Sequence, residues 1–171
     1  MSAFAQTSFE TVRGFALPRT LGPFSLGSVI DNERDNPGLG STVLYNAPGV
    51  KASVYIYDFG IRKLPDGIES DSVKKHFNDT KASLRTAFPT AQVIVEDERM
   101  TVKGLRLLHA AYQYTEGKAG SRKSQISHLY LGSHRGNFIK LRVSYSSVDQ
   151  PDRGDKSHIS FVEDLCKSLT K

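Results

Sequence analysis

The chain has 171 residues, of which 38% are hydrophobic and 24% are charged, an ordinary composition for one globular domain. A formal charge of +5 and a sequence pI of about 9.3 favour anionic partners. They fall short of the dense Lys/Arg stripe of a dedicated nucleic-acid-binding protein. The single Cys166 excludes an internal disulfide framework and a cysteine-rich zinc site. No apolar run approaches the ~20 residues of a transmembrane segment.

The N-terminus leaves the compartment open. It lacks the basic and apolar regions of a secretory signal, yet the tripeptide AFA at positions 3–5 has the small-x-small form of a signal-peptidase site. The protein is cytoplasmic if Met1 is the native start, and exported to the periplasm if a leader preceding Gln6 is missing. We expect residues 1–20 to be a loosely docked segment in front of a single domain that spans residues 21–171.

The first half of the domain predicts short strands separated by turns. Residues 31–40 form a polar loop, whose strongest turn signal is Asn36-Pro37-Gly38. Apolar and polar side chains alternate from Val50 onward, as in a half-buried strand. The predicted strands cover residues 22–27, 41–46 and 50–59.

An amphipathic helix follows. Ser70 or Asp71 can cap its N-terminus, and Pro89 ends it. One stripe of the helix is apolar, consisting of Val73, Phe77, Leu84 and Phe88. The opposite side is polar, consisting of Lys74, Lys75, Asn78, Lys81 and Arg85.

The second half predicts a four-strand meander and a closing helix. The strands cover residues 92–100, 105–115, 124–133 and 138–146. The segment 105–115 is apolar on both faces, which is typical of a strand covered on both sides. Asp155 or Ser157 caps the last helix, whose buried stripe is Ile159, Val162, Leu165, Cys166 and Leu169.

The turn at residues 134–136 predicts how the last two strands pair. It fits a three-residue hairpin loop in which the glycine takes the left-handed conformation. One face then pairs His128 with Arg142 and Tyr130 with Lys140. A one-residue slip would place leucines beside the two cations, and the pattern therefore favours the three-residue loop. The other face pairs Leu129 with Leu141 and Leu131 with Ile139.

These elements predict an α+β fold with a mainly antiparallel sheet of about six strands and two amphipathic helices. The order of strands, helix, four-strand meander and helix resembles the PsbP-like group, which includes the photosystem extrinsic subunit and the bacterial DcrB lipoproteins. The resemblance covers roughly residues 20–170 and rests on element order, helix placement and length. It implies a non-catalytic binding or assembly role, often outside the cytoplasm.

No set of residues predicts catalysis or metal binding. His128 and His134 lie about 20 Å apart along one strand, and no acid or cysteine at ligand spacing supports a site with His109. Cys166 near a helix C-terminus is typical of a core residue. The acids around Glu96 and Glu98 are typical of solvated strand-end charges. We therefore expect no cofactor and no metal, and an enzyme is not favoured.

Two basic features remain as a candidate surface for an anionic partner. The first is the loop 116–124, and the second is the polar face predicted for the last hairpin. The candidate residues are Lys118, Arg122, Lys123, His128, Tyr130, Arg135, Lys140 and Arg142.

The sequence thus favours a non-enzymatic binding or assembly module that holds a protein or an anionic ligand. The alternatives are an enzyme with an unrecognised site, or a weak nucleic-acid-binding protein. The identity of the partner, the compartment and the oligomeric state lie beyond the sequence.

Overall fold

The computed structural model describes residues 8–148 and 151–171. In chain order its elements are β1 (Phe9–Val12), β2 (Phe15–Pro18), β3 (Thr20–Leu21), β4 (Phe24–Asp31), β5 (Ser41–Ala47), β6 (Val50–Tyr57), α1 (Asp71–Ala87), β7 (Gln92–Val102), β8 (Leu105–Glu116), β9 (Lys123–His134), β10 (Asn137–Ser146) and α2 (Pro151–Leu169). The strands β3-β4-β5-β6-β10-β9-β8-β7 form one sheet in that order, and β1 and β2 form a separate hairpin. Neighbouring strands pair antiparallel throughout, which confirms the predicted α+β class.

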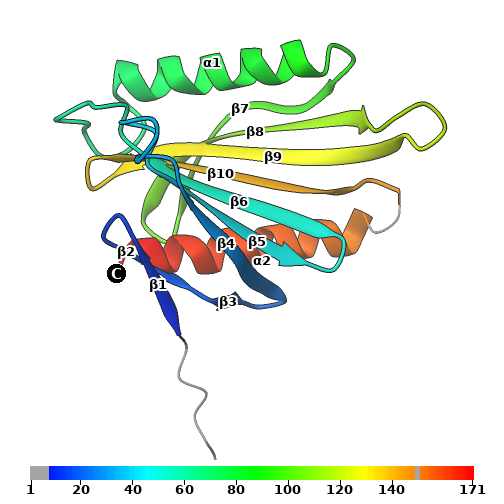
Figure 1. Cartoon of the computed structure of the whole chain (residues 1–171). Coiled ribbons are helices and arrows are strands. Elements are labelled where there is room, and N and C mark those ends of the chain that lie inside the picture. The colour runs from blue at the N-terminus through cyan, green and yellow to red at the C-terminus, as the bar shows by residue number, and fades with distance from the viewer. Residues whose placement is uncertain (1–7, 149–150) are drawn as a thin grey trace, which may run out of the picture.

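One helix lies on each face of the sheet (Figure 1). We call these the α1 face and the α2 face. The core between the α1 face and α1 includes Val73, Phe77 and Leu84 of the helix. A second core fills the space between the α2 face and α2. A sheet covered on both faces explains why segment 105–115 is apolar on both sides, since β8 and β9 contribute to both cores. No helix in the described part of the chain is long and apolar enough to span a membrane.

The predicted caps and stripe of α1 are confirmed. Ser70 is the N-cap, and its hydroxyl accepts a hydrogen bond from the Val73 amide at 3.2 Å. One polar residue departs from the prediction, because the Lys81 side chain is buried and forms ion pairs with Glu96 and Asp97 of β7.

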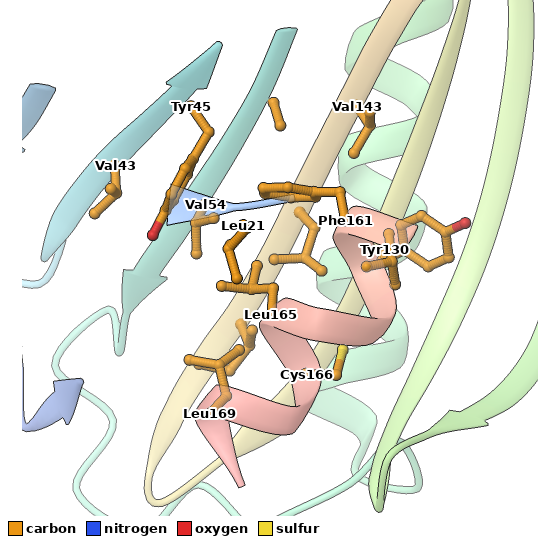
Figure 2. Packing of buried hydrophobic residues seen from close by; sticks show 14 of the residues in the cluster. Leu21, Val43, Tyr45, Val54, Tyr130, Val143, Phe161, Leu165, Cys166 and Leu169 are labelled. Atoms are coloured by element: carbon orange, nitrogen blue, oxygen red, sulfur yellow. The ribbon is translucent and has the colours of Figure 1, made fainter. Parts of the chain in front are cut away.

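The closing helix begins earlier than the sequence predicted. α2 starts at Pro151 instead of Asp155 or Ser157. Proline is well suited to the first position of a helix because the amide it lacks would have no partner there. The predicted stripe packs on the sheet except for Ile159, which is exposed. Phe161, Leu165, Cys166 and Leu169 face strand residues such as Val54, Tyr130 and Val143 (Figure 2).

The N-terminal segment is not loosely docked where the structure describes it. β1 and β2 form a hairpin whose Val12, Phe15 and Leu17 are buried in the α2-face core. The Tyr45 hydroxyl donates to the Pro18 carbonyl at 2.7 Å, which fixes the end of the hairpin on the sheet. The main sheet has eight strands instead of about six, in part because β3 adds an edge strand of two residues.

The predicted register of the last hairpin is wrong by one residue. Arg135 and Gly136 form a two-residue turn with φ angles of 50° and 74°, so both residues are left-handed. Such a turn matches the twist of the strands better than a longer loop. The shift places Arg142 opposite Leu129 and Lys140 opposite Leu131. Leucine beside a cation is accommodated because helices cover both faces, so that neither face is purely polar.

Candidate anion-binding groove

Lys140 and Arg142 of β10 project from the α1 face beside α1. They lie two residues apart on one strand, so their side chains point to the same side at a spacing of about 7 Å. Lys140 sits opposite Tyr55 of β6, and Arg142 sits opposite Ser53 of the same strand. Both side chains are half-buried.

Lys140 has aromatic neighbours instead of acidic ones. Its Nζ lies 4.3 Å from the centre of the Tyr55 ring and 5.5 Å from that of Tyr57. Within residues 8–148 and 151–171 it forms no ion pair and no hydrogen bond through Nζ. Burial, and then the charge of Arg142, lower the pKa of Lys140 to about 8. At pH 7 the ammonium group is therefore charged, although its surroundings favour the neutral amine.

Arg142 is positioned by hydroxyl groups. Its Nε donates to Ser127 Oγ at 3.1 Å, and its Nη2 donates to the Tyr114 hydroxyl at 3.0 Å. These bonds fix the plane of the guanidinium group without neutralising it. Arg142 forms no ion pair with any residue that the structure describes.

Two adjoining hollows lie beside this pair of cations. A cavity of about 200 Å³ between α1 and the sheet is lined by Tyr55, Lys140 and Arg142, together with Thr80, Ser83, Leu84, Ala87, Phe88 and Leu129. A wider hollow of about 630 Å³ shares Tyr55 and Arg142 with it and runs past Lys51, Lys123 and Glu116 to the far ends of the strands. We call the two hollows together the basic groove.

The basic groove has the features of an anion-binding site. Cations that are already partly desolvated gain more from an ion pair than exposed ones do, because less hydration remains to be removed. Arginine fixed in one plane suits carboxylate and phosphate groups, which it can bind through two parallel hydrogen bonds. Among the described residues that line the groove, Glu116 is the single acid.

Comparisons with known proteins identify the fold. No family model and no curated protein matches the sequence. The structure is similar to the solution structure of cyanobacterial PsbP (CyanoP) from Synechocystis sp. PCC 6803. The TM-score is 0.52 at 13% sequence identity, over 96% of this chain and 95% of the other. The chain has the PsbP-like fold. This confirms the resemblance drawn from element order, and at such low identity it concerns the fold alone.

The structure places the residues of the predicted candidate surface in separate parts of the molecule. Lys123, Lys140 and Arg142 line the basic groove. The one-residue change in register places His128 and Tyr130 on the α2 face instead, where both are buried beneath α2. The predicted pairs of His128 with Arg142 and Tyr130 with Lys140 are therefore wrong. A stacking surface built from these four residues is absent.

The remaining candidates lie outside the groove. Lys118 and Arg122 are exposed on the loop between β8 and β9. Arg135 lies at the opposite end of β9, where its guanidinium group stacks on the Phe15 ring at 5.1 Å. Whether Lys118, Arg122 and Arg135 contact a partner stays a prediction.

Other residues considered for chemistry are buried or form ion pairs and hydrogen bonds. Cys166 is fully buried, and burial raises its pKa to about 12, which disfavours the reactive thiolate. Glu96 forms ion pairs with Lys81 and Arg85, and Glu98 contacts His109 at 2.7 Å. Sequence spacing gave no sign of the contact between Glu98 and His109, because the pairing of β7 with β8 contains bulges that shift its register.

Proposed function

We propose that this PsbP-like chain is a non-enzymatic binding or assembly module that holds an anionic group of a partner in the basic groove. The observation that carries the proposal is the pair Lys140 and Arg142. Both are half-buried cations, they share one groove, and neither meets a carboxylate among the described residues. A bound anion would supply the missing counter-charge.

The shape of the basic groove favours an acidic segment of a partner protein. The wider hollow of about 630 Å³ exceeds what one small anion fills, and it continues toward the exposed Lys51 and Lys123. An extended peptide with alternate carboxylates would place one carboxylate at Arg142 and another near these lysines. Tyr55 and Tyr114 offer apolar surface and hydroxyl groups along the same path.

Fluorescence anisotropy with a fluorescein-labelled oligoglutamate peptide tests the proposal. We expect saturable binding at low salt, and we expect Arg142→Met or Lys140→Met to weaken it at least about tenfold, or about 1.4 kcal/mol. Lys118→Met is the matched control. It removes one charge from the exposed loop outside the groove, and we expect less than about a twofold change because an exposed charge contributes little to a specific site.

Three results would overturn the proposal. Absence of saturable binding would remove the acidic-peptide ligand. Equal losses in Lys118→Met and the groove variants would show that net charge alone attracts the peptide. Single-stranded DNA serves as a second probe. Tighter binding of DNA than of peptide, with a steep loss as salt increases, would replace the peptide by nucleic acid.

A further inference from the structure

Three histidines meet on the α2 face, on the other side of the sheet from the basic groove. His109 of β8 and His128 of β9 are neighbours, with Nε2 of the first 3.1 Å from Nδ1 of the second. The ring of His158 in α2 stacks on that of His128, with 3.7 Å between the ring centres. All three rings are buried. We call them the histidine cluster.

The hydrogen bonds around the histidine cluster determine where its protons lie. The Glu98 carboxylate can only accept, so Nδ1 of His109, at 2.7 Å, carries a proton. In the neutral ring, Nε2 of His109 then has a lone pair and accepts from Nδ1–H of His128. Nε2 of His128 then carries a lone pair, which points toward the Tyr145 hydroxyl at 3.3 Å. Through this chain His109 orients the His128 ring, and metal-binding histidines are commonly oriented by a hydrogen bond from their other ring nitrogen.

His158 has an equally available nitrogen. Its Nε2 lies 2.5 Å from the Tyr130 hydroxyl, whose oxygen can accept a hydrogen bond from Nε2–H. Its Nδ1 is buried and has no hydrogen-bond partner among the described residues. The Asp155 carboxylate lies one helical turn earlier, 3.7 Å from that Nδ1. A buried ring nitrogen without a partner is costly unless something binds to it.

We propose that His128, Asp155 and His158 form a binding site for a divalent transition metal such as zinc. One ligand atom from each residue lies within 4.8 Å of the others. The Tyr145 hydroxyl lies 3.3 Å from Nε2 of His128 and 3.4 Å from the Asp155 carboxylate, so it faces the same space. This site is independent of the function proposed for the basic groove.

The ligand set suits zinc. Two imidazole nitrogens and one carboxylate oxygen are common ligands, and a tetrahedral ion holds ligand atoms about 3.3 Å apart. The separation of 3.7 Å between His158 and Asp155 is close to this value. The Asp155 side chain is exposed and can move to complete the geometry.

Both histidines present the neutral form that a metal requires. Burial and the neighbouring rings hold the pKa of His128 at about 3, and burial with the influence of His109 holds that of His158 at about 4. No proton therefore has to leave either ring at pH 7. The metal would also draw α2 to the sheet, since its ligands come from β9 and from the first turns of the helix.

Zinc titration of the untagged chain by calorimetry, together with the visible absorption spectrum of the cobalt complex, tests the proposal. We expect one ion per chain and a cobalt spectrum typical of tetrahedral coordination. Asp155→Asn should weaken binding at least about tenfold, and His158→Gln should weaken it more, as is usual when a metal ligand is lost. Asp155→Asn alters an exposed side chain, and it keeps the test valid if His158→Gln fails to fold.

Two matched controls make the same kinds of substitution at positions outside the proposed metal site. Asp164→Asn removes an exposed carboxylate from the same helix, and His134→Gln removes a partly exposed histidine near the turn between β9 and β10. We expect both to bind zinc as the unmodified chain does. The proposal is overturned if the unmodified chain shows no saturable binding. It is also overturned if Asp155→Asn and His158→Gln bind as tightly as the controls.

Discussion

Replacing Lys140 with methionine should stabilise the protein, although it removes a side chain on which the proposed binding depends. Burial and the charge of Arg142 lower the pKa of Lys140 from 10.5 to about 8. At about 1.4 kcal/mol per pKa unit, the charged form costs the folded state roughly 3 kcal/mol at pH 7. The contacts with Tyr55 and Tyr57 offset about 1 kcal/mol of this. Methionine keeps an unbranched stem without the charge, so we expect a gain of about 2 kcal/mol in the free energy of unfolding.

The gain should depend on pH in a direction that follows from the pKa shift. The folded pKa of Lys140, about 8, lies below the unfolded value of 10.5. Between these two pH values the unfolded chain binds more protons, so the stability of the unmodified protein rises with pH. The advantage of Lys140→Met should therefore be largest below pH 8 and disappear as the pH approaches 10.5.

Urea unfolding followed by far-ultraviolet circular dichroism measures the effect, since the chain contains no tryptophan. Lys51→Met is the matched control, because Lys51 lies on the rim of the basic groove with an exposed side chain. We expect the control to change stability by less than about 0.5 kcal/mol. A Lys140→Met protein that is no more stable than the original would refute the reasoning. So would a gain that stays constant from about pH 7 to about pH 10, because the folded pKa of Lys140 lies inside this interval.

Three further substitutions test the backbone. Gly40→Ala should destabilise severely, by more than about 3 kcal/mol in urea unfolding. Gly40 has a φ of 54°, and an added Cβ would lie 1.9 Å from the Ile56 carbonyl oxygen. Gly60→Ala, also at positive φ but with no atom within 4 Å, should cost only about 1 kcal/mol, and equal losses would contradict the steric explanation. Arg135→Asn should stabilise the turn by up to about 1 kcal/mol, because asparagine adopts the left-handed conformation more readily; a loss of stability would argue against the two-residue turn.

The sequence predicted the elements from β5 onward well, but it missed the β1–β2 hairpin and placed the last hairpin in the wrong register. The register error has one physical reason. Strands and α1 are encoded by periodicity and by local signals such as Ser70 and Pro89. The register argument assumed that one face of the hairpin is apolar and the other polar. A helix covers each face instead, so Leu129 and Leu131 pack under α1 while Leu141 packs under α2. Arginine at a positive φ is also uncommon, which made the longer loop with a single glycine look preferable.

The sites were predictable only in part. A shared face for Lys140 and Arg142 follows from the two-residue period of a strand, but the identity of that face depended on the register. The cluster of His128 with His158 joins a strand to a helix 30 residues later, and its geometry depends on how α2 packs against the sheet. A search for ligands at fixed spacing within one element could not reveal it.

A comparison of Lys140 with the buried Lys81 supports the proposal for the basic groove. The Lys81 side chain, 7% exposed, meets Asp97 at 2.5 Å and Glu96 at 3.5 Å. This buried cation is thus paired with carboxylates of the chain itself. Lys140, which projects from the α1 face of the sheet, receives none from the described residues, although leaving a buried charge unpaired is destabilising. A carboxylate of a partner protein would form with Lys140 the ion pair that Asp97 forms with Lys81. The unpaired charge of Lys140 therefore supports the proposed binding, since it does not stabilise the fold.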